Sequence, residues 1–415
     1  MEEGFPFVYP VSDFLMTFFG LVLFAVDVIL DVQLVVSFYE EKAFVWMGVV
    51  VFLLLVSSGI VQLFSCLWYY ADSQMLESVA ENCMRKRHIL VLTHLLHLAV
   101  PLRYVSLLDI SCRNFRSKNP YLEGVAVYLN HDLSMLRLFE TFSESAPQLV
   151  LMIVIYIQKH ELSLLTCLKA LCSAGAIAFS VAMYHRSMRS FLPAKEKQGF
   201  GSSVVYFVWN LLLIGPRVVA LALFACVLPC HTAVHFVSLW LPLVLWAWMQ
   251  GTDLMDNLAG EWLFRAAIGL IWYFSWFNVA KGGSLWRSII YHSFTMVDVG
   301  FLLGLWWYWQ EEQREPHVIC STVLSCYILG LVLKVIYYKW FHPRKPVLRT
   351  TLDILEFSED EVDFRSLPLT PDVGATPSVE AGRVVPIMVN KRMRNLAVNF
   401  YSPSAEPERG GAPLT

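Results

Sequence analysis

The sequence has few charged residues for its length. Of its 415 residues, 16% are Asp, Glu, Lys or Arg, whereas soluble domains carry about 25%. In their place, 57% of the residues are hydrophobic, and the mean hydropathy is +0.54. This composition argues against a soluble globular protein and predicts an integral membrane protein with many spans.

Signatures of several other protein classes are also missing. The chain contains no glycine-rich phosphate loop, zinc-protease helix motif or nucleophile elbow, so we expect no enzyme chemistry, no cofactor and no nucleic-acid partner. No basic region precedes the first apolar run, so we expect no cleavable signal peptide. The nine cysteines are odd in number and scattered. Cys226, Cys230, His231 and His235 lie close together at a short loop, but we expect no metal site there.

Ten apolar segments are candidates for membrane spans, each of which needs about 20 apolar residues. They cover residues 14–38, 44–70, 88–108, 132–157, 162–184, 202–228, 232–250, 262–280, 285–309 and 317–341. If all ten crossed the membrane, Arg85-Lys86-Arg87 would lie inside but Arg186 and Arg189 would lie outside. That distribution violates the positive-inside rule.

The charges are better distributed if two segments dip into the membrane and return on the same face. Segment 88–108 is the most polar of the ten, and segment 262–280 is short and is followed by Lys281 and Arg287. With both re-entrant, eight segments span and both termini are cytoplasmic. We therefore predict an all-α polytopic membrane protein with eight transmembrane helices and two re-entrant half-helices in two pseudo-repeats, followed by a disordered cytoplasmic C-terminal tail.

This organisation divides the chain into four regions. A first transmembrane repeat covers 1–184, a cytoplasmic linker covers 185–201, a second transmembrane repeat covers 202–343, and a cytoplasmic regulatory tail covers 344–415. Each repeat would consist of two spans, one half-helix and two further spans. Such internal repeats are typical of transporter folds.

Charged residues lie inside the predicted spans, where insertion costs about 2.5–3.5 kcal/mol each. Seven of them form our candidate path: Asp27, Asp31, Arg137, Glu140, Glu144, Arg217 and Asp298. Lys334 also lies inside a predicted span. The spacing places Asp27 and Asp31 on one helix face. Two interpretations remain open, because these groups could be structural ion pairs or could line a route for a headgroup, an ion or a polar solute.

Several stretches together resemble the XK-related family. They are "DLSMLRLFETFSESAPQL" (132–149), "GSSVVYFVWNLLL" (201–213), "QGTD" (250–253), "YFSWFNVA" (273–280) and "VIYYKWFHP" (335–343). The resemblance implies eight spans with two re-entrant half-helices, and it implies that the seven charged residues form a path for phospholipids, phosphatidylserine included. It also implies a plasma-membrane location, activation by effector caspases, and a single-span immunoglobulin-superfamily chaperone as partner.

The tail contains two features that fit such regulation. Asp360-Glu361-Val362-Asp363 has the form that effector caspases cut after the last aspartate, and chance would give it in on the order of one in a thousand tails of this length. Beyond it, Met393, Leu396 and Phe400 recur at helical spacing among basic residues. This patch either binds anionic lipid or docks under the bundle as an inhibitor that cleavage releases.

The sequence therefore predicts a caspase-activated, energy-independent phospholipid scramblase that exposes phosphatidylserine on the cell surface in apoptosis. Two alternatives remain: a secondary transporter of a polar solute such as an amino acid, and a non-catalytic escort subunit of another membrane protein. A scramblase needs a polar path open sideways to lipid, whereas a transporter needs an occluded pocket near the midplane. An escort subunit needs neither.

Overall fold

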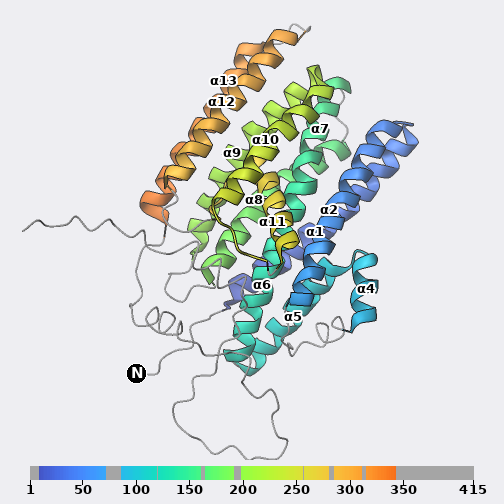
Figure 1. Ribbon diagram of the computed structural model, residues 1–415, viewed down its shortest axis with the longest axis vertical. Coiled ribbons are helices and arrows are strands. Elements are labelled where there is room, and N and C mark those ends of the chain that lie inside the picture. Colours follow the sequence, from blue (N-terminus) through green and yellow to red (C-terminus); the bar gives the residue numbers. More distant parts are fainter. Residues whose placement is uncertain are drawn as a thin grey trace, which may run out of the picture.

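The protein folds as a bundle of long helices (Figure 1). The computed structural model describes residues 9–71, 86–118, 120–159, 164–190, 198–255, 257–279, 285–310 and 315–342, and within these ranges it contains no strand. Eight helical segments there are long and apolar enough to cross a bilayer. The predicted fold class, an all-α membrane protein with eight spans, is thus confirmed.

The helices follow the apolar segments of the sequence closely, because each apolar run must satisfy its backbone hydrogen bonds internally within the bilayer. The elements are α1 (Val11–Glu40), α2 (Phe44–Ala71), α4 (Arg87–Leu95), α5 (Ala99–Ser117), α6 (Pro120–Glu140), η1 (Thr141–Ser145), α7 (Ala146–Lys159), α8 (Leu164–Ser190), α9 (Phe200–Val227), α10 (Pro229–Met249), α11 (Leu258–Phe274), α12 (Leu285–Trp309), α13 (Pro316–Ile336) and η2 (Tyr337–Phe341). Figure 1 shows α1 and α2 at one side of the bundle and α12 and α13 at the other.

The third span differs from its prediction. We expected a helix over 132–157, but the apolar helical segment runs from Leu122 to Lys159, 38 residues in all. A helix of that length measures about 57 Å, so it extends well beyond a hydrocarbon core of about 30 Å. The apolar run marks only the part suited to lipid, and the helix continues past it because Pro120 and the residues after it suit a helix start.

Segment 88–108 contains a sharp bend. Helices α4 and α5 meet at 118° across a short break, where His97 adopts a left-handed backbone conformation with φ 59°. The His97 imidazole forms a hydrogen bond with the Ser58 hydroxyl of α2. Nearby, Arg103 donates to the Ser65 hydroxyl at 3.1 Å and pairs with Asp132 at 3.4 Å. The bend is compatible with a re-entrant segment, and the path of this segment relative to a membrane remains a prediction.

The described part of segment 262–280 begins within a short helix. Helix α11 has 17 residues, about 26 Å; it ends at Phe274, and the next residue, Ser275, has an extended backbone. It is not among the eight candidate spans. The α11 helix packs against the middle of the bundle, where the Phe142 and Phe274 rings lie 6.2 Å apart. Its re-entrant path is likewise still a prediction.

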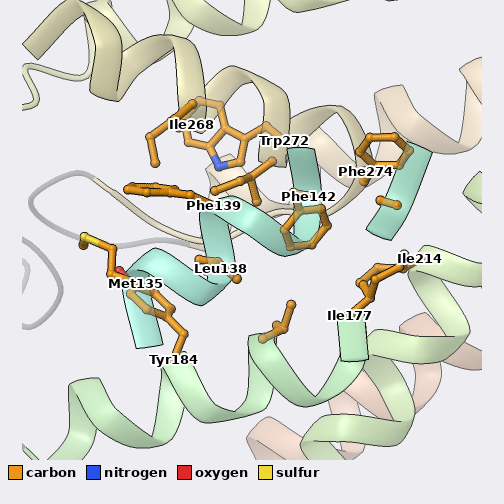
Figure 2. Packing of buried hydrophobic residues seen from close by; sticks show 14 of the residues in the cluster. Met135, Leu138, Phe139, Phe142, Ile177, Tyr184, Ile214, Ile268, Trp272 and Phe274 are labelled. Carbon is orange, nitrogen blue, oxygen red and sulfur yellow. The ribbon is translucent and has the colours of Figure 1, made fainter. Parts of the chain in front are cut away.

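One large apolar core joins the two halves of the chain. Figure 2 shows Phe139 and Phe142 facing Trp272 and Ile268 of α11, with side chains of α8 and α9 close by. The cluster extends from Tyr9 to Tyr337. Packing of α11 onto α6 and η1 therefore fixes the second half against the region of the first half that carries Arg137, Glu140 and Glu144.

Candidate polar path in the bundle

A buried lysine holds the two aspartates of α1. The ammonium of Lys169, on α8, lies 2.6 Å from Asp27 Oδ1 and 2.7 Å from Asp31 Oδ1. The lysine side chain is fully buried, and both carboxylates are nearly so. The i, i+4 spacing of the aspartates makes this bridge possible, since it places both carboxylates on the helix face that meets α8.

Arg137 and Glu140 form an ion pair within one turn of α6. The Arg137 guanidinium also lies over the ring of Phe24 on α1, 4.9 Å from its centroid. Directly after Glu140 the helix widens into the π-helical turn η1, whose five residues are all buried. Widened turns of this kind occur mostly as single bulges and often at functional sites.

Glu144, within η1, lies apart from the Arg137–Glu140 pair. It gathers instead with Asp27 and Asp31, and one carboxylate oxygen from each lies within 4.8 Å of the others. No described base forms an ion pair with Glu144. Among the described residues, these three carboxylates lie close enough together to hold a divalent cation, and the Lys169 ammonium already supplies a positive charge to two of them.

We name these six residues the first-half cluster: Asp27, Asp31, Arg137, Glu140, Glu144 and Lys169. The cluster holds four carboxylates and two bases, so it is acidic when all six groups are charged. Burying such groups is costly unless they are paired. Ion pairing therefore explains part of the cluster, and Glu144 is left as the unpaired acid.

A cavity of about 30 Å³ lies beside this cluster, between α1, α5, α6 and α8. Its lining is mixed. The polar lining side chains are Thr17, Tyr104, Asn130, Ser134, Arg137 and Ser180, and methionine, leucine and phenylalanine side chains of α1, α6 and α8 complete the wall. A cavity of this size has room for about two water molecules, and its wall places polar side chains beside apolar ones.

The second half has its own buried pair. Arg217, on α9 next to Pro216, pairs with Asp298 on α12. Asp298 also lies 3.2 Å from His235 Nε2 on α10, and the other ring nitrogen of His235 is 3.0 Å from the Tyr273 hydroxyl. Arg217, His235 and Asp298, the second-half cluster, thus connect three spans and the end of α11.

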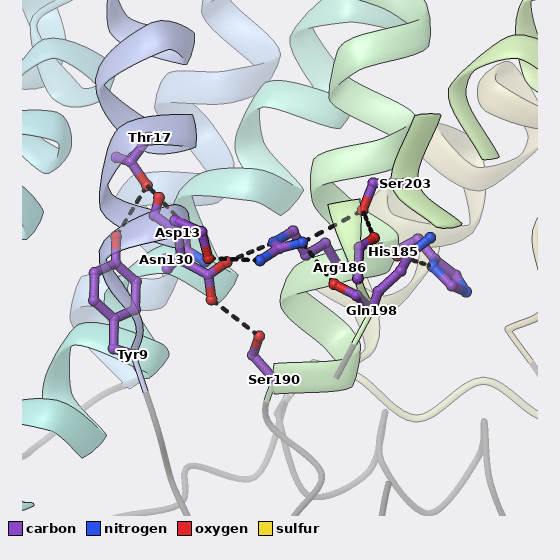
Figure 3. Close-up of polar contacts among 11 residues, drawn as sticks. Tyr9, Asp13, Thr17, Asn130, His185, Arg186, Ser190, Gln198 and Ser203 are labelled. Atoms are coloured by element: carbon purple, nitrogen blue, oxygen red, sulfur yellow. Dashed lines mark hydrogen bonds and ion pairs between the residues drawn. The ribbon is translucent and has the colours of Figure 1, made fainter. Parts of the chain in front are cut away.

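A third network lies where α1 begins and α8 ends (Figure 3). Arg186 donates to Asp13 at 2.5 Å and to the carbonyl oxygen of Gln198 at 2.7 Å. The Gln198 side chain donates in turn to the Tyr337 hydroxyl near the end of α13, at 3.3 Å. The start of α1 and the end of α13 therefore lie on the same face of the bundle.

Tyr9 extends this network just outside the first span. Its hydroxyl lies 3.0 Å from that of Thr17, a residue that lines the cavity (Figure 3). Burial raises the pKa of Tyr9 above its ordinary value. The phenol therefore remains protonated at neutral pH and is a donor at this end of the cavity.

The predicted intramembrane charges lie in two groups, and their role as a lipid path remains a prediction. Asp27, Asp31, Arg137, Glu140 and Glu144 lie in the first-half cluster, whereas Arg217 and Asp298 lie in the second-half cluster. The caspase motif at 360–363 and the docking residues Met393, Leu396 and Phe400 fall outside the described residues.

Sequence reasoning missed three basic partners. Lys169 is a single lysine inside the apolar run "LLTCLKALCSAG", and its position in a span was a usable signal. Arg103 and Arg186 were visible as charges near predicted membrane segments, but their partners Asp132 and Asp13 lie far away in sequence. His235 was considered for metal binding, and its ring instead contacts Asp298 and Tyr273.

Comparison with known proteins agrees with this architecture. Residues 15–343 match the family described as XK-related protein. The chain is 40% identical to XK-related protein 8 of Gasterosteus aculeatus, over 95% of this chain and 98% of the relative. It is 41% identical to XK-related protein 8 of Tetraodon nigroviridis over 97% and 99% of the two chains, and 35% identical to that of Pan troglodytes over 95% of each. The chain therefore belongs to the XK-related family.

Proposed function

We propose that this protein is an energy-independent phospholipid scramblase, activated by caspases, that exposes phosphatidylserine at the plasma membrane in apoptosis. The observation that carries the proposal is the buried first-half cluster together with the wall of side chains beside it. That wall places polar side chains such as Arg137, Asn130 and Ser134, which suit a headgroup, next to apolar side chains of α1, α6 and α8. A scramblase lowers the cost of moving a headgroup through hydrocarbon, and such a lining would supply that reduction.

Regulation is assigned to the C-terminal tail. The caspase-type motif Asp360–Asp363 separates the helical bundle from the basic patch around Met393, Leu396 and Phe400. A tethered inhibitor acts at a high effective concentration, and cutting its tether removes that advantage. Cleavage after Asp363 removes 364–415 and leaves the complete bundle. The two-repeat division at 184 and 202, the cytoplasmic termini and the immunoglobulin-superfamily chaperone belong to the same proposal.

Reconstitution tests the transport activity directly. A chain that ends at Asp363 is placed in vesicles with a trace of fluorescent lipid, and a membrane-impermeant reductant is added outside. A scramblase allows more than half of the fluorescence to be bleached, whereas a static bilayer protects the inner leaflet. Glu140→Gln should slow bleaching or reduce expression, because Arg137 would lose its charged partner. Protected inner-leaflet fluorescence with well-folded truncated protein would refute the proposal.

The role of the tail is tested in cells that lack other scramblases. Asp363→Ala should block phosphatidylserine exposure after an apoptotic stimulus, and the chain ending at Asp363 should expose it without the stimulus. Substituting Asp for Met393, Leu396 and Phe400 together should partly reproduce the effect of the cut. If the Asp363→Ala variant exposed phosphatidylserine normally, the motif would be an ordinary acidic linker and not a cleavage site.

A cation-coupled transporter is the second candidate. The carboxylates of Asp27, Asp31 and Glu144 favour it, because clustered acids in a membrane commonly bind cations or protons that drive transport. The vesicle experiment separates the two functions. A transporter would carry a labelled solute along a sodium or proton gradient and leave lipids in place, whereas a scramblase moves lipid with no gradient.

A further inference from the structure

An ion pair holds α1 against α8 just beyond one end of the cavity beside the first-half cluster. The cavity lies between these two helices, and at this end its lining residues are Met16 on α1 and Met183 on α8. Three residues further along each helix, Asp13 accepts from the Arg186 guanidinium, and both side chains are buried. Three residues are about one helical turn, so the pair closes the space between the helices about one turn beyond the cavity.

The same ion pair is connected to the end of α13. The Arg186 guanidinium also donates to the carbonyl oxygen of Gln198, at 2.7 Å. The Gln198 side-chain oxygen lies 3.0 Å from His185 Nδ1 (Figure 3), and its amide nitrogen donates to the Tyr337 hydroxyl at 3.3 Å. Both Gln198 and Tyr337 are buried. We name the residues Asp13, Arg186, Gln198 and Tyr337 the clasp.

The clasp lies between the helix that leads into the tail and the helix that lines the cavity. Tyr337 is the first residue of η2, which ends at Phe341, close to the start of the tail at residue 344. Helix α13 packs chiefly on α9, whereas α1 packs on α2, α5 and α8. The hydrogen bonds of the clasp therefore give the end of α13 a physical connection to the beginning of α1.

We propose that the clasp is an autoinhibitory contact: it keeps this end of the cavity closed, and it opens when cleavage removes 364–415. This rests on the proposed function, in which loss of the tail activates lipid transport. A cavity with room for about two water molecules admits a headgroup only if α1 and α8 separate. Separation at this end requires the Asp13–Arg186 pair to break or move. Each side-chain hydrogen bond that holds the pair in place changes such an equilibrium by a factor of about 2 to 10.

Two substitutions weaken the clasp and leave its ion pair intact. Tyr337→Phe deletes the hydroxyl that the Gln198 amide contacts, and Gln198→Leu deletes that amide. Tyr327→Phe is the matched control, because it makes the same chemical change at a buried tyrosine of α13. The hydroxyl of Tyr327 contacts His292 on α12 and lies outside the clasp.

Lipid transport is measured on the full-length chain in the vesicle bleaching assay, without caspase. We expect Tyr337→Phe and Gln198→Leu each to raise the bleaching rate about two- to tenfold above that of the full-length wild type. Tyr327→Phe should leave the rate unchanged. In chains that end at Asp363, where the clasp is already open, none of the three substitutions should change the rate. Unchanged full-length rates in both clasp variants would overturn the inference.

Hydrogen–deuterium exchange distinguishes a failure of the clasp from a failure of the proposed function, because it does not require lipid transport. Removing the tail from the wild type should speed amide exchange in residues 13–20 and 180–187 and leave residues 295–302 of α12 unchanged. If the truncated chain moves no lipid but shows this faster exchange, the proposed function is wrong and the clasp is supported. If the truncated chain moves lipid and exchange in the first two segments is unchanged, the clasp is wrong.

Discussion

The two halves of the bundle differ in the balance of their buried acids and bases. The first-half cluster holds four carboxylates against two bases, with Glu144 unpaired. In the second half, Asp298 is shared by Arg217 and His235, and Lys334 has no carboxylate partner among the residues that the structure describes. One half therefore has an excess of buried acid and the other an excess of buried base.

This difference indicates which buried charges are held by a partner and which are not. Charges with close opposite partners, such as Lys169 and Arg217, cannot be removed singly without leaving an uncompensated buried group. Among the described residues, Glu144 and Lys334 have no such partner, so we expect that removing either one relieves a cost. The comparison thus separates buried charges that are paired from buried charges that are not.

The largest expected effect comes from breaking the Lys169 bridge. Lys169→Met leaves Asp27 and Asp31 buried without a base, and the loss of one partner of a buried pair costs about 3–5 kcal/mol. We expect little monodisperse protein on size exclusion and a strongly lowered melting temperature. Adding Asp27→Asn and Asp31→Asn should restore much of the folded protein.

Lys334→Met is the matched substitution in the other half. It makes the same chemical change at a lysine that is also buried, but it leaves no described carboxylate without a basic partner. We expect its melting temperature to equal or exceed that of the wild type. If Lys169→Met were tolerated and Lys334→Met were not, the division into structural and unpaired charges would be wrong.

A smaller effect is expected at Asp298. Asp298→Asn removes the negative charge opposite Arg217 but keeps an oxygen of similar shape, and Arg217 also donates to the Tyr273 carbonyl oxygen at 3.2 Å. The loss should be about 1–3 kcal/mol, measured as a moderate fall in melting temperature. Arg217→Met combined with Asp298→Asn should be more stable than Asp298→Asn alone. Equal melting temperatures for the single variant and the wild type would contradict a structural role for the pair.

Much of this contrast could be anticipated from the sequence, and part of it could not. Apolar runs located seven of the eight spans to within six residues at each end, because a backbone in hydrocarbon must form its hydrogen bonds internally. The same runs did not predict the first twelve residues of α6, because a part of a helix that lies outside the lipid does not need apolar side chains. Asp27 and Asp31 were identifiable as a pair from their spacing. Their partner Lys169 is 142 residues from Asp27, and no local pattern encodes a contact at that separation.

The change of helical register at η1 was also not predictable from the sequence. An uninterrupted α-helix would place Arg137, Glu140 and Glu144 along one face, and the sequence supported that expectation. The π-helical turn at Thr141–Ser145 begins between the two glutamates. Glu140 pairs with Arg137 within α6, whereas Glu144, inside the turn, lies with the aspartates of α1. Such a turn depends on tertiary packing around Phe142 and Ser143, which the composition of the segment does not reveal.

Narrowing the first-half cavity should affect transport more than stability. A Cβ atom at Gly20 would lie 3.2 Å from the Tyr104 hydroxyl and 3.4 Å from the Phe179 ring, both of which line the cavity. Gly20→Ala should therefore slow lipid bleaching in vesicles with a small change in melting temperature. Gly304→Ala, in α12, is the matched control, because a Cβ there meets nothing within 4 Å. Equal rates for the two variants would argue against lipid passage through this cavity.

The smallest effect belongs to an exposed pair that joins α1 and α7. Lys159 donates to Glu41, and this hydrogen bond lowers the pKa of Glu41. Because this pKa is lowered, the pair stabilises the folded state fully at pH values above the ordinary glutamate pKa of about 4.3. The contribution is lost as the pH falls through the pKa of Glu41 in the folded state. Both side chains are more than 40% exposed, so the contribution should be about 0.2–1 kcal/mol.

Glu41→Gln should lower the melting temperature slightly at pH 7 and not at pH 3, and 1 M salt should remove the difference. Glu315→Gln, at an exposed Glu–His pair of the second half, is the control. A Glu41→Gln effect as large as that of Lys169→Met would mean that exposure does not distinguish these ion pairs.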